Sequence, residues 1–211
     1  MISLGNLSDM GKPPRKERRD AAENRQRILR VAEALFAEKG VTAVCMSEIA
    51  QAAGVGKGTL YRRFANKADL CLALMDTQMV EFQNSMMARI QQMTEHNVAR
   101  LSQLEAFLDA LVHFVDVHAP LLREVQSSES VDEIHSFSKP YFWQFMTING
   151  LLREAMKNGE LATDVDTEFL ADALLAALNP IHFSNQREIR QFSLSRISNG
   201  LQKMVQAHAR N

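Results

Sequence analysis

Apolar residues recur with helical spacing along most of the chain. Near the start they fall at i, i+3, i+4, i+7 and i+8, at Ile28, Val31, Ala32, Leu35 and Phe36. This spacing puts them on one face of a helix that begins near Arg25 and ends at Gly40, a residue type common just after a helix. Two shorter apolar groups predict brief helices over about 46–53 and 57–64, with Gly54 breaking the chain between them.

The rest of the pattern is also helical. Asn66 is a typical N-cap residue and Asp69 stands three positions later, so a long helix is expected from Asn66 onward. Further apolar groups predict helices over about 101–120, 140–157, 166–180 and 186–207. The first of these should end near Pro120, and the inward faces of the last two include Phe169 and Ile189. No strand pattern or internal repeat stands out, so we expect an all-α fold.

The composition is that of a folded protein without a membrane span. The chain is 46% hydrophobic and 23% charged, and it contains no run of about 18 apolar residues. Its first residues lack the apolar core of a signal peptide. Cys45 and Cys71 form no disulfide framework, which favours a reducing cytoplasm. The six histidines are scattered without ligand spacing, so no metal site or cofactor is expected.

Charge is distributed unevenly along the chain. Residues 1–67 contain 13 Lys and Arg against 7 Asp and Glu, a net charge of +6. Because the whole chain carries -1, residues 68–211 sum to -7. A basic end on an otherwise acidic chain indicates a module that binds a polyanion, joined to a part with another task. A solvated basic tail would account only for about the first twenty residues.

The stretch GVGKGTLYRRF, residues 54–64, allows two interpretations. Its GKGT sequence matches the end of a phosphate-binding P-loop, which would suggest a nucleotide-binding enzyme. The first glycine of that motif would fall on Gln51, however, and a P-loop must follow a buried strand. The preceding SEIAQAAG is polar, rich in alanine and helical in pattern. We therefore disfavour the P-loop, and no nucleophile–base or paired-carboxylate arrangement predicts an enzyme.

The favoured interpretation is a helix-turn-helix. Two short helices separated by a glycine turn and propped by a longer first helix have this arrangement, and the second short helix enters the major groove of DNA. Residues 56–63 would then face DNA, with Leu60 and Phe64 anchoring them from beneath. Gly56 and Gly58 lack a Cβ, so the chain can approach phosphates or base edges closely.

Residues 25 to about 75 closely resemble the N-terminal DNA-binding domain of TetR-family transcriptional regulators. The likeness rests on a first helix ending AEKG, followed by EIAQAAGV, KGTLYRRF and NKADL. It implies a homodimer that reads a palindromic DNA operator, usually as a repressor released by a small-molecule effector. Beyond about residue 80 only the helical layout and the length match, and the resemblance implies about nine helices in all.

The resemblance implies a set of DNA-contacting residues: Ser47, Lys57, Gly58, Thr59, Tyr61, Arg62, Arg63 and Lys67. Within this set, Tyr61 and Lys67 would hold phosphates, whereas Thr59 and Arg62 would face the bases. Gly58 would allow the close approach.

The remaining assignments depend on departures from the family pattern. Cys45 stands where a Ser or Thr commonly caps the second helix, which makes Ser47 the substitute contact. Arg63 replaces the usual histidine or tyrosine before Phe64; we assign it a phosphate contact and leave a base contact open. Lys57 would sit at a phosphate or a base edge.

These observations divide the chain into three parts. Residues 1–22 are charged and poor in apolar residues, which predicts a flexible basic arm, and its segment KPPRKERR either adds DNA contacts or is a plain tail. The resemblance assigns 23–68 to the helix-turn-helix domain and 69–211 to effector binding and dimerisation. It also implies that the helices over about 166–180 and 186–207 form a four-helix bundle with a second subunit.

The central helices should enclose the effector pocket, a largely apolar cavity with a few polar groups. The candidate lining residues are Phe82, Met86, Phe107, Leu111, Phe114, His118, Phe142, Trp143, Met146 and Asn149. Plain core packing is the commoner role for such residues, and the sequence leaves both roles open.

Overall fold

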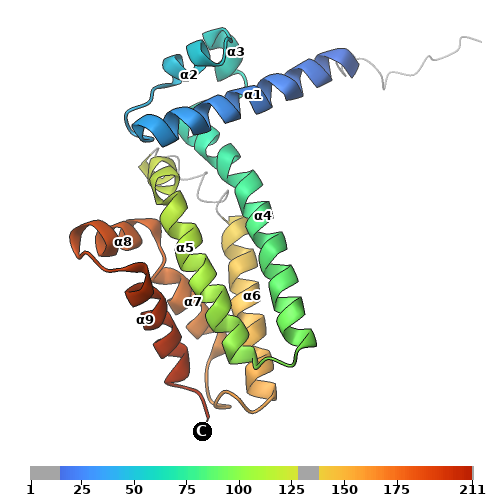
Figure 1. The fold of residues 1–211 in the computed structure, drawn as a ribbon, viewed down its shortest axis with the longest axis vertical. Coiled ribbons are helices and arrows are strands. Elements are labelled where there is room, and N and C mark those ends of the chain that lie inside the picture. Colours follow the sequence, from blue (N-terminus) through green and yellow to red (C-terminus); the bar gives the residue numbers. More distant parts are fainter. Residues whose placement is uncertain (1–14, 128–137, 211) are drawn as a thin grey trace, which may run out of the picture. The chain divides into compact units, whose positions relative to one another are not determined.

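The computed structural model describes residues 15–127 and 138–210, which form helices joined by turns (Figure 1). In these ranges no strand occurs beyond one isolated bridge between Leu161 and Ala209, so the all-α prediction is confirmed. The helices are α1 (Arg15–Lys39), α2 (Met46–Ala52), α3 (Lys57–Tyr61), α4 (Lys67–Glu95), α5 (Arg100–Ser127), α6 (Ser138–Lys157), α7 (Thr167–Ala176), α8 (Pro180–Ser184) and α9 (Leu194–Gln206). Within the same ranges, no helix has the length and apolar character needed to cross a bilayer.

The chain divides into two compact units, Met1–Leu70 and Cys71–Asn211. In the first unit, α1 begins at Arg15, about ten residues before the start that the apolar pattern indicated. Residues 15–22 are therefore helical, which corrects the expectation of an arm over 1–22; residues 1–14 lie outside the described part. The early start has a simple cause, because Arg, Lys, Glu and Ala are good helix formers even without an apolar face.

The first unit has a small core to which α1, α2 and α3 all contribute. α1 packs against α2, and α2 packs against α3. Ile28 of α1, Ile49 of α2 and Leu60 of α3 are each completely buried. The three helices thus meet on one apolar centre, which fixes the position of α3 on the unit.

The start of α4 is capped as the sequence predicted. The Asn66 Oδ1 accepts the Asp69 amide at 2.8 Å, and the Asp69 Oδ2 accepts the Ala65 amide at 2.9 Å. The first bond satisfies a helix-start amide that has no partner within the helix, and the second ties the residue before the cap to the first turn of α4.

The second unit is built around α5. Figure 1 shows α5 running between α6 and α9, and both pack against it. Phe107, Leu108 and Leu111 of α5 are completely buried, together with Ile148 and Leu152 of α6. This arrangement leaves α5 as the central helix of the unit's core.

α5 does not end at Pro120, contrary to the prediction. The helix runs through Pro120 to Ser127. A proline inside a helix removes one hydrogen bond to the carbonyl four residues earlier. Leu122 and Val125 beyond it are buried, so apolar packing offsets the lost bond and the helix continues.

The C-terminal helices also differ from the prediction. The helix expected over 186–207 is divided into a π-helical turn over Asn185–Ile189 and α9. The break occurs because Gln191 takes a left-handed φ of 53°. Ser193 then caps a new helix, and its hydroxyl accepts the Arg196 amide at 3.1 Å. Phe169 and Ile189, expected to face inward, are 72% and 74% exposed.

Glu160 caps the N-terminal end of α5. Its carboxylate accepts the amides of Arg100 and Leu101, at 3.0 and 2.9 Å, from sixty residues away in sequence. The Glu160 carbonyl in turn accepts the Arg210 amide at 2.9 Å. A side chain from the turn after α6 thus serves as the cap of α5 and also contacts the C-terminal end.

Candidate nucleic-acid interface and effector cavity

The turn between α2 and α3 requires a glycine. Gly54 has a φ of +62°, a conformation that other residues adopt only with strain. Its amide donates to the Gln51 carbonyl at 3.1 Å, and the Val55 amide donates to the Ala50 carbonyl at 3.0 Å. The turn therefore ends α2 with its last carbonyls satisfied and sends the chain into α3.

The inner side of α3 is anchored in the core. Leu60 is completely buried and Phe64 is 3% exposed. The guanidinium of Arg25, from α1, lies 5.6 Å from the centre of the Phe64 ring. Because these anchors hold one side of the short helix, its other side is presented outward.

The outward side of α3 and of the two residues after it is basic. Lys57, Arg62 and Arg63 are exposed, and Tyr61 is 50% exposed. The first turn of α3 contains no acidic residue. The Arg62 Nη2 donates to Thr59 Oγ1 at 3.3 Å, so the two candidate base-facing side chains lie together. A basic face with hydroxyl groups suits phosphates and base edges.

Neither Gly56 nor Gly58 is required by packing inside this unit. A Cβ built on either residue has no heavy atom within 4 Å, and neither residue has a positive φ. Gly58 therefore carries the helix-propensity disadvantage of glycine without an internal reason. The open space beside it is available to a molecule outside the chain.

Lys67 differs from the other candidate contacts because it is turned toward the protein. Its Nζ donates to the Val41 and Val44 carbonyls, at 3.0 and 3.3 Å. The ammonium group thus ties the start of α4 to the segment between α1 and α2. A phosphate contact by Lys67 stays a prediction. The ammonium group would make it while bonded to the Val41 and Val44 carbonyls.

The start of α2 shows the substitution that the sequence indicated. Cys45 occupies the N-cap position with extended backbone and makes no side-chain capping bond. Its Sγ lies 3.0 Å from the Ser47 Oγ. That hydrogen bond is the main cause that lowers the pKa of the Cys45 thiol. Ser47 is half-buried at this helix start.

The GKGT sequence lies in a helix-turn-helix and not in a P-loop. The segment before it is α2, and Lys57 to Thr59 belong to α3. A P-loop needs a strand at this point, from whose end its amides reach the phosphates. The alternative interpretation as a nucleotide-binding enzyme therefore fails on secondary structure.

Several predicted effector residues form an aromatic cluster in the core of the second unit. Phe107 is completely buried, with its ring centre 6.2 Å from that of Phe82 and 5.7 Å from that of Trp143. Phe82 also contacts the ring of Phe114 at 4.6 Å. The cluster fills space between α4, α5 and α6 as packed core.

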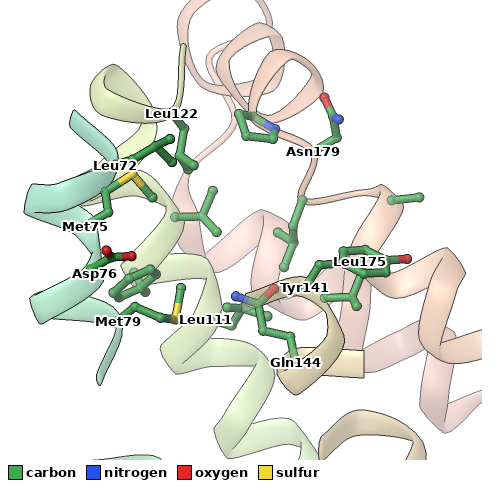
Figure 2. A pocket seen from close by; sticks show the side chains of 15 residues that line it. Leu72, Met75, Asp76, Met79, Leu111, Leu122, Tyr141, Gln144, Leu175 and Asn179 are labelled. Carbon is green, nitrogen blue, oxygen red and sulfur yellow. The ribbon is translucent and has the colours of Figure 1, made fainter. Parts of the chain in front are cut away.

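A cavity of about 260 Å³ opens beside this cluster, within the second unit (Figure 2). Its lining residues are Leu72, Met75, Asp76, Met79, Leu111, Phe114, Val115, Leu122, Tyr141, Gln144, Leu175, Ala176, Leu178, Asn179 and Pro180. Among the residues predicted from the sequence, Leu111 and Phe114 line it. The sequence interpretation missed its polar groups, which come from Asp76, Tyr141, Gln144 and Asn179.

The other effector candidates lie elsewhere in the unit. Phe142 and Met146 are 63% and 51% exposed, whereas Met86 and Asn149 are buried outside the lining. His118 is buried behind the Phe114 ring, and its Nε2 lies 2.6 Å from the Gln78 Oε1. Burial lowers the pKa of His118.

Two lining residues have defined hydrogen bonds. The Tyr141 hydroxyl donates to Asp172 Oδ1 at 2.7 Å. Burial and then this bond raise the pKa of Tyr141 to about 12, so the phenol is neutral at physiological pH. The Asn179 Oδ1 caps α8 by accepting the amides of Ile181 and His182. The polar side of the cavity is thus pre-arranged by contacts within the unit.

Comparison with known proteins agrees with this geometry. The family model described as "Bacterial regulatory proteins, tetR family" matches residues 28–74. An HTH-type transcriptional regulator of Staphylococcus aureus (strain MRSA252) is 30% identical over 184 residues, covering 87% of this chain and 93% of the relative.

Solved structures share the fold over nearly the whole chain. A transcriptional regulator from Saccharomonospora viridis in complex with choline matches with a TM-score of 0.68 and 20% identity, covering 90% of this chain and 100% of its own. FadR of Thermus thermophilus, in complex with lauroyl-CoA, matches with a TM-score of 0.67 and 16% identity, covering 86% of this chain and 93% of its own. From the helix-turn-helix, the family model and the relative at 30% identity, it follows that this chain belongs to the TetR family of DNA-binding transcriptional regulators.

Proposed function

We propose that this protein is a homodimeric repressor that binds a palindromic operator and leaves it when a small molecule enters the cavity of its second unit. The observation that carries the proposal is the exposed basic side of α3, held from beneath by Leu60 and Phe64. Ser47, Lys57, Gly58, Thr59, Tyr61, Arg62, Arg63 and Lys67 are the proposed DNA contacts. Such a regulator acts in the cytoplasm, where bacterial DNA lies.

An exposed apolar surface supports dimerisation through the C-terminal helices. Phe169 of α7, Ile181 of α8 and Ile189 of the π-helical turn are 72%, 65% and 74% exposed. A contiguous patch of exposed apolar side chains marks an interface with another protein, and we propose that these three residues belong to such a patch. We propose that residues 166–180 and 186–207 cover this surface with a second copy.

A dimer would set the spacing of the operator. Two recognition helices enter successive major grooves when they lie about 34 Å apart, or a multiple of it. An effector that prefers a dimer with another spacing weakens operator binding in proportion to its different affinity for the two states. The S. viridis and T. thermophilus neighbours were solved in complex with choline and lauroyl-CoA, which supports the binding of a small molecule by this chain.

The proposal is tested by selecting bound sites from a random DNA library at about physiological salt, with the mass of the free protein measured in solution. An enriched inverted repeat and a dimer at micromolar concentration would support it. A monomer, or salt-sensitive binding without enrichment of any sequence, would contradict it.

Arg62 and Lys67 are expected to contribute differently to DNA binding. Arg62→Ala should relax base preference at one position of each half-site by about 1–3 kcal/mol, because only a base contact discriminates between sequences. Lys67→Ala should weaken operator and random DNA alike and flatten the salt dependence, and it should also destabilise the segment that Lys67 holds through Val41 and Val44. Binding to both DNAs across a salt series measures this; equal losses on both DNAs for both variants would contradict the division.

Gly58→Ala is expected to change stability and DNA binding in opposite directions. The added methyl group meets no protein atom within 4 Å and improves helix propensity, so the free energy of unfolding should rise by up to about 1 kcal/mol. Operator affinity should fall by about tenfold or more if DNA occupies the space. Thermal unfolding and operator titration measure the two effects. Gly150→Ala in α6, also without a close neighbour, is the matched control and should leave operator affinity unchanged.

A further inference from the structure

The cavity of the second unit contains a single ionic group among its described lining residues, the Asp76 carboxylate. The same set contains no lysine, arginine or histidine. Asp76 makes no hydrogen bond or ion pair with any residue in the described part of the chain. Figure 2 shows Asp76 on α4 between Met75 and Met79, on the side of the cavity opposite Tyr141 and Leu175. The carboxylate therefore has no counter-ion among the residues that the structure describes.

The surroundings of Asp76 are apolar and aromatic. Met75, Met79 and Leu122 are almost completely buried, and Leu111 is completely buried. Rings from Phe114 and Tyr141 also line the cavity. Aromatic faces attract cations, and thioether groups adapt to apolar ligands of irregular shape. These neighbours would accept an apolar body, and the aromatic rings would add to the attraction that Asp76 has for a positive charge.

The remaining polar groups are neutral. Gln144 and Asn179 bring amides, and the hydroxyl hydrogen of Tyr141 is already donated to Asp172. None of them offsets the charge of Asp76. A ligand with a carboxylate or phosphate in this cavity would meet a like charge and find no basic partner among the described lining residues.

We propose that the effector of this protein is an amphipathic organic cation, a protonated amine or quaternary ammonium joined to an apolar body. Asp76 is exposed whereas Leu111 is completely buried, so the positive group would lie at the open side and the apolar body deeper in. The inference rests on the proposed function only in taking this cavity as the effector site. It adds a chemical class that the fold alone does not specify.

Three probes with a common phenylalkyl body test the charge preference: phenylbutylamine, phenylbutanol and phenylbutyrate. At neutral pH they are positive, uncharged and negative. Calorimetric titration of the full chain should show the amine binding about tenfold or more tightly than the other two. Asp76→Asn should reduce amine affinity about tenfold and bring it close to that of the alcohol. Glu81→Gln removes an exposed carboxylate from the same helix outside the cavity, so it should leave all three affinities unchanged.

The outcomes separate this inference from the proposed function. Tighter binding of phenylbutyrate than of phenylbutylamine, an unchanged preference in Asp76→Asn, or binding of none of the probes would overturn the cation proposal. Operator binding is measured on the same proteins without probe. A selective response to the amine in a protein that shows no operator preference would leave the cation site standing and overturn the repressor function. Intact operator binding without amine preference would do the reverse.

Discussion

Leu60→Ala is expected to abolish operator binding and to destabilise the DNA-binding unit by about 2–5 kcal/mol. Leu60 is completely buried beneath α3, and truncation of such a leucine removes its apolar contacts and leaves a cavity. α3 has only five residues, so it depends on this anchor more than on its own hydrogen bonds. Urea unfolding gives the change in stability, and operator titration well below the unfolding midpoint gives the change in affinity.

Leu152→Ala provides the matched control for this result. Leu152 is also completely buried, but it belongs to α6 in the second unit. A similar loss of stability should follow, while the folded protein keeps its affinity for the operator. Equal operator affinity in Leu60→Ala and the unchanged protein would mean that α3 is not the element that contacts DNA.

Phe107→Ala is expected to cost about 3–5 kcal/mol in the free energy of unfolding. Its ring is completely buried and contacts both Phe82 and Trp143, so truncation opens a cavity in the centre of the second unit. Trp143 is the only tryptophan of the chain, and its fluorescence reports unfolding at this site.

The control for this prediction is an exposed phenylalanine in the same unit. Phe142 is 63% exposed, so Phe142→Ala should change stability by no more than about 0.5 kcal/mol. If Phe107→Ala kept its stability and lost only affinity for a cavity ligand, Phe107 would be a lining residue and the core assignment would be wrong.

The DNA-binding unit was largely predictable because its signals are local. A glycine between two short helices predicts a turn, and Gly54 has the left-handed backbone that favours this residue. Asn66 and Asp69 predict the start of α4, and both make the capping bonds. Leu60 and Phe64 are apolar residues within a basic stretch and both are buried, although α3 ends at Tyr61 and Phe64 lies beyond it. Each of these effects is decided within a few residues, where a sequence pattern is most informative.

The second unit was harder to predict because its structure depends on packing between residues that are far apart in the sequence. Pro120 is a helix breaker by local rules, but Leu122 and Val125 beyond it are buried, and this packing keeps α5 intact. The apolar pattern also does not distinguish a core face from an exposed apolar face. Phe169 has the spacing of an inward residue and is nevertheless exposed.

The residues that line the cavity were also hard to predict from the sequence, because neighbouring helices decide which side chains reach it. Phe107 and Phe114 lie seven positions apart on α5, yet only Phe114 reaches the cavity, because Phe107 is enclosed by Phe82 and Trp143. An acidic residue on a helix is usually a solvated surface group, so Asp76 gave no signal in the sequence. Its role follows only from the helices that surround it.

The contacts of Glu160 have a consequence for the order of folding. The first two amides of α5 receive their acceptor only when a loop of about sixty residues has closed, and loops of this length close with an entropic cost that local helix formation does not carry. The first turn of α5 should therefore become ordered late, after α6 and the turn that follows it. On the ribosome it must wait until residue 160 has emerged, and a chain ending before that point would leave both amides without their acceptor.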